Sequence, residues 1–367
     1  MNVLIVTGEK SSENYASLLV DALLSIDKNI KLYSLCSNIL NKKTVKIGDY
    51  RDISIIGVKE AAGIVGKAVK LLSKVKTSLV ENNVDMVILM DFPEFNMRMA
   101  KFAHKLGIKV VYYISPQVWA WREYRTKALF KYSDLVIPIL PFEKTFFNLR
   151  GVEKSKVSYF GHPLVDLLHN KLNKDVKTEN RILIMPGSRK TEIEHNAEVM
   201  LQSAKLLKEN LRNFEFVWAL PDNISFEYAK QFLEGFDFIK IERDSHSLMQ
   251  SSYFGILKSG TTTLEAAMLG LPMVVVYRIS KTSYSLGKLL IRGVKYISLP
   301  NLIAGDKIVE ELVGSNITSE QIAVKCLDVC KNKDRYEKLK ERLKGIACVL
   351  GEYPVTPKIA QKIYSII

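Results

Sequence analysis

Short apolar runs and amphipathic stretches alternate along most of the 367-residue chain. Runs such as 3–6, 84–90 and 182–185 are continuous and end at small or polar turns, which is typical of strands buried on both faces. Stretches such as 12–26 repeat apolar residues at three- and four-residue spacing, as helices packed on a sheet do. The pattern predicts an α/β fold with doubly wound parallel sheets.

A polar stretch at 170–180 interrupts this alternation, which then restarts. Because the chain is too long for one ordinary core, we expect two Rossmann-like domains that face each other across a cleft. The predicted boundaries are 1–169 for the first domain, 170–180 for the linker, 181–345 for the second domain and 346–367 for a terminal segment. Three further predictions are a strand and turn at 159–165, a helix at 223–234 and a helix at 284–291.

The stretch 253–278 organises the second half. A strand-like run leads into a bare turn at Ser259 and Gly260, and a helix starts at Thr261 or Thr262. The N–H groups at such a helix start, together with the helix dipole, favour an anion such as a diphosphate. We therefore expect this turn to hold a nucleotide.

Capping-box spacing marks two helix starts in this half, Thr262 with Glu265 and Thr191 with Glu194. A capping role would explain Glu265 without any ligand. We expect these side chains to close the first turns of their helices.

A second small turn, at Gly187, Ser188 and Arg189, also precedes a predicted helix. Its guanidinium could bind phosphate through two parallel hydrogen bonds. Arg189 could instead form a surface ion pair, but its place in a Pro-Gly-Ser turn favours an anion site.

In the first half, Gly8 and Glu9 follow the first strand, at the end where open α/β sheets place their ligands. A tight strand-to-helix turn is the simpler explanation of Gly8. The turn has no GxGxxG pattern, which counts against a dinucleotide fingerprint.

Two carboxylates, Asp91 and Glu94, lie beside a proline-stiffened turn after the strand 84–90. A rigidly held carboxylate can serve as the general base for a substrate hydroxyl. Alternatively, Asp91 or Asn96 caps the following helix. The sequence does not decide between these interpretations.

Two other segments have more than one interpretation. The loop 115–122 contains Trp119 and Trp121, which suit sugar or acyl binding but also interdomain packing. The stretch 55–80 is a basic amphipathic helix or helix pair, suited to an anionic bilayer surface or to packing on a sheet with lysines outward. Its lysines are Lys67, Lys70, Lys74 and Lys76.

Lys and Arg number 53 against 39 Asp and Glu, a formal charge of +14 that is spread along the chain. This charge suits anionic small molecules, lipid surfaces or nucleic acid. Four scattered cysteines predict neither a disulfide framework nor a metal pair, and fit a reducing compartment. With no signal-peptide pattern and no apolar run of about 18 residues, we expect a cytoplasmic protein attached at most to a membrane surface.

Taken in order, the motifs of the chain resemble those of the lipid-A-disaccharide synthases, bacterial GT-B glycosyltransferases with two Rossmann domains. The resemblance runs nearly end to end. The motifs that carry it are Gly8-Glu9, DFPEFN at 91–96, YISPQVWAWR at 113–122, LPFEK at 140–144, GHP at 161–163, PGSR at 186–189, SGT at 259–261 with Glu265, PMV at 272–274 with Tyr277-Arg278, and Tyr296 with SLPNL at 298–302 and Ala304-Gly305.

The resemblance implies transfer of 2,3-diacylglucosamine from UDP to 2,3-diacylglucosamine 1-phosphate, with inversion, giving the β-1,6-linked disaccharide 1-phosphate. It implies no cofactor and no metal, since the UDP-sugar is a substrate. The implied partners are these two acylated sugars and the cytoplasmic face of the inner membrane, with no nucleic acid. It also implies a terminal segment that packs on the N-terminal domain or on a partner subunit, and the second arrangement would make a homodimer.

The resemblance also implies roles for individual residues. Asp91 is the implied base, with Glu9 and Arg189 as further catalytic residues. The implied UDP-binding residues are Gly187, Ser188, Arg189, Ser259, Gly260, Thr261, Glu265 and Asn301, with Glu265 on the ribose.

Three positions depart from the family pattern: Ser12 replaces a glycine, Glu13 replaces an aspartate, and Glu94 stands where aspartate is common. These departures bear on the acceptor side. The alternatives are an enzyme like the UDP-N-acetylglucosamine 2-epimerases, a GT-B transferase acting on a lipid-linked peptidoglycan precursor, and a non-catalytic peripheral membrane protein. Release of UDP only with an acylated acceptor would separate them.

Overall fold

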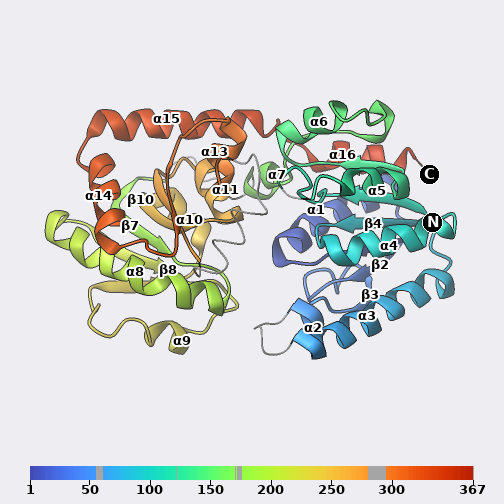
Figure 1. The fold of residues 1–367 in the computed structure, drawn as a ribbon, viewed down its shortest axis with the longest axis horizontal. Coiled ribbons are helices and arrows are strands. Elements are labelled where there is room, and N and C mark those ends of the chain that lie inside the picture. The colour runs from blue at the N-terminus through green and yellow to red at the C-terminus, as the bar shows by residue number, and fades with distance from the viewer. Residues whose placement is uncertain (55–60, 121, 170, 172–175, 280–294, 367) are drawn as a thin grey trace. The chain divides into compact units, whose positions relative to one another are not determined.

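The computed structural model describes residues 1–54, 61–120, 122–169, 171, 176–279 and 295–366. Two compact units make up the chain, Met1–Asn170 together with Leu350–Ile367, and Lys171–Val349 (Figure 1). The predicted helix at 284–291, Trp121, and parts of the segments 55–80 and 170–180 lie outside the described residues.

The first unit contains a parallel sheet with the strand order β3-β2-β1-β4-β5-β6. Its strands are β1 (Asn2–Val6), β2 (Lys31–Leu35), β3 (Val45–Gly48), β4 (Met86–Met90), β5 (Lys109–Tyr113) and β6 (Leu135–Ile137). Its α-helices are α1 (Lys10–Ile26), α2 (Arg51–Ser54), α3 (Ala61–Glu81), α4 (Pro93–Lys105), α5 (Arg125–Tyr132), α6 (Pro141–Asn148), α7 (Leu164–His169) and α16 (Thr356–Tyr364).

The second unit contains a parallel sheet with the order β12-β11-β10-β7-β8-β9. Its strands are β7 (Glu179–Met185), β8 (Glu215–Ala219), β9 (Ile239–Glu242), β10 (Ser252–Lys258), β11 (Met273–Arg278) and β12 (Glu310–Gly314). Its helices are α8 (Lys190–Asn210), α9 (Phe226–Lys230), α10 (Ser245–Ser251), α11 (Thr261–Met268), α13 (Leu299–Ala304), α14 (Ser319–Cys330) and α15 (Lys333–Val349).

Both sheets have the same order when each is numbered from its own first strand, the Rossmann order 3-2-1-4-5-6. The strand order reverses between β1 and β4 in the first unit and between β7 and β10 in the second. The predicted doubly wound α/β architecture is confirmed. Ligands of such sheets bind outside the carboxyl ends of the strands at this reversal, so each unit has one favoured position for a site.

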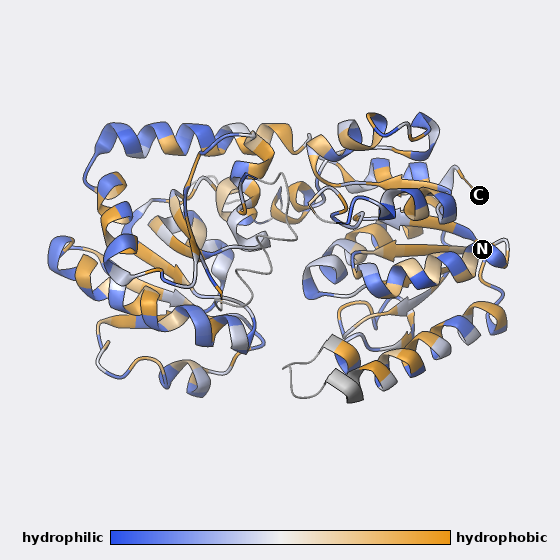
Figure 2. Cartoon of the chain, viewed as in Figure 1, coloured by the Kyte–Doolittle hydropathy of each residue, from blue (hydrophilic) through white to orange (hydrophobic). Residues whose placement is uncertain are grey.

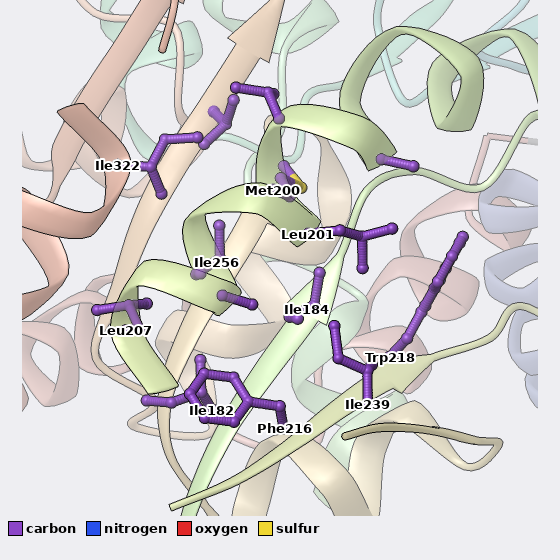
Figure 3. Packing of buried hydrophobic residues seen from close by; sticks show 14 of the residues in the cluster. Ile182, Ile184, Met200, Leu201, Leu207, Phe216, Trp218, Ile239, Ile256 and Ile322 are labelled. Carbon is purple, nitrogen blue, oxygen red and sulfur yellow. The ribbon is translucent and has the colours of Figure 1, made fainter. Parts of the chain in front are cut away.

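Buried strands and helix faces form the core of each unit. In the second unit, Ile182 and Ile184 of β7, Phe216 and Trp218 of β8 and Leu207 of α8 belong to one fully buried cluster (Figure 3). Figure 2 shows how hydrophobic and hydrophilic residues are distributed over the helices. Helix α15 is hydrophilic over most of its length, and α3 alternates between hydrophobic and hydrophilic turns. Among the described helices, none combines the length and the apolar character needed to cross a bilayer.

Two predicted elements are wrong. The helix at 223–234 is limited to α9, where the Ser225 side chain accepts a hydrogen bond from the Tyr228 N–H and starts the helix late. The predicted strand at 159–165 is a turn followed by α7, because His162 Nδ1 accepts the Leu164 N–H at 3.1 Å while the His162 N–H donates to the Leu350 carbonyl.

The C-terminal segment packs within the first unit. The carboxylate of Asp166 accepts the backbone N–H groups of Val355 and Thr356 at the start of α16. Helix α16 then packs along α1. The chain therefore leaves the first unit at its linker and returns to it at Leu350.

Candidate active site

The predicted site residues gather at the two reversal points. In the first unit, Gly8 and Glu9 follow β1, and Asp91 follows β4, its direct neighbour in the sheet. In the second unit, the predicted residues follow β7 and β10, which are also paired. These residues are Gly187, Ser188, Arg189, Ser259, Gly260 and Thr261.

Asp91 lies in a strained backbone turn. Asp91 and Phe92 have φ values of 52° and 50°, in the left-handed region that non-glycine residues seldom adopt. The Asp91 N–H donates to the Ile114 carbonyl at 3.2 Å, and the Tyr112 hydroxyl donates to the Asp91 carbonyl at 3.2 Å. Strain that the surroundings hold in place is typical of functional residues.

The capping interpretation of this turn is wrong. Phe92 is the N-cap residue of α4, so neither Asp91 nor Asn96 occupies that position. Asn96 lies inside the helix and donates from its amide to the carbonyls of Met90 and Asp91, at 3.2 and 2.7 Å. These two hydrogen bonds stabilise the turn between β4 and α4. Asp91 is half-buried and does not occupy the N-cap position.

Glu94 is engaged elsewhere. Arg125 donates to both of its carboxylate oxygens, at 2.8 and 3.2 Å, and Arg122 donates to one of them. The hydrogen bond from Arg125 is the main reason why the pKa of Glu94 is lowered. A carboxylate neutralised in this way is a poor proton acceptor, which favours Asp91 as the base.

The departures at Ser12 and Glu13 have clear structural roles. The Ser12 hydroxyl accepts the Glu9 N–H at 3.2 Å and donates to the Glu9 carbonyl at 2.8 Å, so it fixes the turn after β1. Glu13 is fully buried and accepts the N–H groups of Ser37, Ile39 and Leu40, at 3.0, 2.6 and 3.3 Å. Both residues therefore shape the loops around the first reversal point.

The loop that carries Trp119 is held by a buried carboxylate from α6. Glu143 accepts the indole N–H of Trp119 at 3.1 Å and the hydroxyl of Ser115 at 3.2 Å, in addition to the N–H groups of Ile139 and Leu140. Burial raises the pKa of Glu143 to about 7, against the lowering effect of these four donors. Glu143 was not predicted from the sequence as a site residue, although a glutamate at the third position of a helix is a signal for bonding to the backbone N–H groups before that helix.

In the second unit, a carboxylate already occupies the turn at Gly187–Arg189. Glu192 Oε2 accepts the Ser188 N–H at 2.9 Å, and more weakly the Ser188 hydroxyl and the Arg189 N–H, each at 3.4 Å. Glu192 is the third residue of α8, so the predicted box of Thr191 with Glu194 is wrong by two residues. Glu194 instead accepts the hydroxyl of Tyr228.

Lys258 is a second residue that was not predicted from the sequence. Its ammonium donates to Glu192 Oε1 at 2.8 Å, from the last position of β10. Burial is the largest single influence on Glu192 and would raise its pKa. The charge and hydrogen bond of Lys258, the Ser188 N–H and the charge of Arg189 together outweigh burial and lower the pKa. The signal in the sequence was a lysine directly before the Ser259-Gly260 turn.

Helix α11 starts at Thr261, one residue before the predicted cap, Thr262. Gly260 is the N-cap residue, and Thr263 donates to its carbonyl from both the backbone N–H, at 3.1 Å, and the hydroxyl, at 2.8 Å. The predicted box of Thr262 with Glu265 is therefore wrong. Glu265 lies in the second turn of α11, 3.3 Å from the Nε2 atom of His246.

Asn301 is buried and engaged within its own segment. Its amide group donates to the Val309 carbonyl and to Glu311, at 2.9 and 2.7 Å, and its carbonyl accepts the N–H groups of Ile308 and Val309, at 2.7 and 2.9 Å. This geometry suits a residue that holds the loop after α13 in place.

Within the described residues, no group of three or more His, Cys, Asp or Glu side chains could hold a metal ion. The cysteines among them are free thiols. The groups that gather at the reversal points are carboxylates, a lysine, an arginine, hydroxyls and backbone N–H groups, which suit hydrogen bonding to sugars and phosphates.

A family model described as lipid-A-disaccharide synthetase matches residues 3–353. The chain is 34% identical over 379 residues to the lipid-A-disaccharide synthase of Sulfurihydrogenibium sp. (strain YO3AOP1), covering 95% of this chain and 94% of that protein. It is 34% identical over 360 residues to the lipid-A-disaccharide synthase of Trichlorobacter lovleyi, covering 95% and 93%.

Solved structures with low sequence identity share the fold. The UDP-GlcNAc 2-epimerase from Neisseria meningitidis bound to UDP-GlcNAc is similar with a TM-score of 0.69 and 16% identity, covering 100% of each chain. A ugt transferase from Siraitia grosvenorii in complex with UDP has a TM-score of 0.60 and 10% identity, covering 99% of each chain. At these identities the likeness shows the fold alone, an α/β two-domain fold of the GT-B type.

Proposed function

The chain belongs to the lipid-A-disaccharide synthetase family, and from that premise we propose the substrates and roles for this glycosyltransferase of lipid A biosynthesis. The proposed donor is UDP-2,3-diacylglucosamine and the proposed acceptor is 2,3-diacylglucosamine 1-phosphate. The products are the β-1,6-linked disaccharide 1-phosphate and UDP. Inversion at the anomeric carbon requires one base and one direct displacement.

One observation supports this proposal above the others: the predicted residues lie at the reversal points of two Rossmann-type sheets. The first reversal point presents a strained carboxylate, and the second presents N–H groups, hydroxyls and cations. A transferase needs both kinds of group, because a proton leaves the acceptor while negative charge develops on the departing diphosphate.

On the acceptor side, Asp91 takes the proton from the attacking 6-hydroxyl. Its turn is anchored by Tyr112, Ile114 and Asn96, so the carboxylate keeps one direction during the reaction. Glu9 supports the acceptor from the neighbouring turn, whose shape Ser12 fixes.

On the donor side, Arg189 and Ser188 bind the diphosphate, and the N–H groups at the start of α11 add further donors. Glu265 binds the ribose hydroxyls from its position 3.3 Å from His246 Nε2. Asn301 acts through the loop that it holds. We assign no cofactor to the reaction, because the UDP-sugar carries its own leaving group.

We also propose that α3 brings the enzyme to an anionic membrane surface, where both acylated sugars are found. Val65 and Val69 are 63% and 53% exposed on this helix, and Lys67, Lys70 and Lys74 are exposed beside them. Lys76 instead lies over the ring of Phe102, 4.8 Å from its centre, and packs on the unit itself. Localisation at the cytoplasmic face of the inner membrane and assembly as a homodimer remain predictions.

The test is the product formed from defined substrates. Purified protein is incubated with UDP-2,3-diacylglucosamine, with or without the acylated 1-phosphate acceptor, and UDP and lipid products are measured by mass spectrometry. We expect UDP release that depends on the acylated acceptor, with a disaccharide 1-phosphate as product. Conversion of UDP-N-acetylglucosamine to its 2-epimer would contradict the proposal, and so would no turnover with any acceptor.

A further inference from the structure

The ion pair between Glu192 and Lys258 lies where the family function requires phosphate binding. Glu192 belongs to the helix after β7 and Lys258 to the end of β10, 66 residues apart in the sequence. The ammonium is 2.8 Å from Glu192 Oε1 and 3.9 Å from the Cβ position that a side chain at Gly260 would have. Lys258 thus reaches both turns that were predicted to bind the donor.

The backbone of the turn leaves space for the Glu192 carboxylate. Gly187 has a φ of +147°, and a Cβ atom there would lie 2.4 Å from Glu192 Cβ and 2.9 Å from Oε2. A glycine is therefore needed for the carboxylate to approach the Ser188 N–H. With an N–H group, a hydroxyl and an ammonium around it, Glu192 has the same set of donors as a bound phosphate oxygen would have.

We propose that Lys258 is a further donor-binding residue and that Glu192 is its internal counter-ion, which the diphosphate replaces when UDP-sugar binds. This inference rests on the proposed function, since it assumes a UDP-linked donor. On binding, the Lys258 ammonium and the Ser188 N–H exchange a carboxylate oxygen for a phosphate oxygen. The Glu192 side chain turns toward solvent, which its place at the exposed end of the Ser188 turn allows.

The exchange keeps the hydrogen bonds of both donors. Lys258 and Ser188 have an anionic acceptor throughout, so neither donor loses its partner. The diphosphate carries more charge than the carboxylate and can reach Arg189 as well, which drives the replacement. Glu192 therefore lowers donor affinity by competing for the site, and it keeps Lys258 oriented between successive turnovers.

The test is calorimetric binding of UDP, UMP and uridine to the full chain and to the variants Glu192→Gln, Lys258→Met and the double variant. Glutamine keeps an acceptor for the Ser188 N–H but lacks the charge. We expect Glu192→Gln to bind UDP about fivefold more tightly, the scale of one partly exposed ion pair. We expect Lys258→Met to bind UDP about tenfold more weakly, the scale of a lost charge-assisted hydrogen bond. Uridine affinity should change in neither variant.

Lys240→Met is the matched control, because it removes another lysine paired with a glutamate in the same unit. It should leave the UDP affinity unchanged. In the double variant, Glu192→Gln should increase UDP affinity by less than it does alone, because there is no Lys258 ammonium to release from the ion pair. If Glu192→Gln bound UDP no more tightly than wild type, the proposed exchange would be overturned. It would also be overturned if Lys258→Met weakened uridine binding as much as it weakened UDP binding. Wild-type protein that binds no UDP would instead overturn the proposed function.

Discussion

At the reversal point of the first unit, a Cβ atom on Gly8 would lie 2.4 Å from the Phe92 side chain, whereas on Gly187 of the second unit it would lie 2.4 Å from that of Glu192. The same topological position is thus packed by an aromatic ring in one unit and by a carboxylate in the other. Lys258 then adds a cation to the second turn.

Carboxylates of the two units also differ in their donors. The buried Glu13 and Glu143 of the first unit accept hydrogen bonds from hydroxyl, indole and backbone N–H groups. The half-buried Glu192 of the second unit accepts from an ammonium in addition to the Ser188 N–H and hydroxyl. Under the proposed function, the difference teaches that one sheet topology can serve a carboxylate that activates a hydroxyl in one unit and a turn that binds phosphate in the other.

Replacing Asp91 by Asn should break the acceptor side alone and gives the largest expected effect. Removing a general base typically costs on the order of 100- to 10,000-fold in turnover, and the shape of the turn is conserved in this variant. The measurement is steady-state turnover together with calorimetric UDP binding. UDP affinity should not change, and Glu94→Gln, the matched control, should keep most of its turnover. Near-normal turnover by Asp91→Asn would end its candidacy as base.

Replacing Gly187 by Ala should break the donor side. At Gly187 the φ is +147°, and an added Cβ would lie 2.4 Å from Glu192 Cβ. Backbone strain and overpacking together should therefore lower the free energy of unfolding by about 2–4 kcal/mol. Gly345→Ala in α15 is the control, because its Cβ would meet nothing within 4 Å and alanine favours a helix. Urea unfolding and UDP binding measure both effects. A Gly187→Ala variant as stable as wild type would show that the turn tolerates a side chain.

Much of the fold was predictable from the sequence, because strand and helix periods are local properties. The runs 3–6 and 84–90 are read directly as buried strands, and the structure has them as Asn2–Val6 and Met86–Met90. The short strands β2 and β3 were missed, since Lys31–Leu35 and Val45–Gly48 are brief and mixed in polarity. The turn at 159–165 was misread because its structure depends on a hydrogen bond to Leu350.

The sequence predicted the turns of the site but not the side chains from other segments that contact them. Gly187 and Ser259 are marked by local turn chemistry, but the partners of these turns come from distant parts of the chain. Glu143 meets Ser115 across 28 positions, and Lys258 meets Glu192 across 66. Capping boxes were placed at the wrong residues because the spacing of a Thr and a Glu does not locate the helix start. Helix α8 has Arg189 at its N-cap with Glu192 as its third residue, and α11 has Gly260 at its N-cap and no capping box.

Glu143 and Glu192 should give opposite pH dependences of stability. The pKa of Glu143 is raised by burial from 4.5 to about 7, so its contribution is present below pH 4.5 and is lost as the pH rises to about 7. The loss is on the order of 3 kcal/mol and should be absent in Glu143→Gln. The pKa of Glu192 is lowered, so its contribution is present above 4.5 and is lost as the pH falls.

The measurement for this pair is urea unfolding at about pH 3, pH 5 and pH 8, followed by tryptophan fluorescence. The wild type should lose stability relative to Glu143→Gln between about pH 5 and pH 8. Relative to Glu192→Gln, the wild type should lose stability as the pH falls from about 5 to about 3. Parallel pH profiles for wild type and Glu143→Gln would show that Glu143 keeps its charge throughout, held by its four donors.

The smallest expected effect compares two lysine-bearing helices, α3 of the first unit and α15 of the second. Both expose lysines, but α3 also exposes Val65 and Val69 beside them, whereas α15 is hydrophilic over most of its length (Figure 2). Charge and apolar surface together bind an anionic interface, and each lysine contributes about 1 kcal/mol there. Replacing Lys70 and Lys74 by glutamine should therefore weaken binding to anionic vesicles roughly 30-fold.

The matched control replaces Lys338 and Lys344 of α15, which are equally exposed, by glutamine. Both double variants lose the same net charge, so a general electrostatic attraction would weaken in both to the same extent. Flotation with vesicles containing anionic lipid, repeated with neutral lipid, measures the difference. If α3 is the membrane contact, only the Lys70 and Lys74 variant loses binding, and turnover with short-chain soluble acceptors stays the same. Equal partitioning of the two variants would place the contact elsewhere on the protein.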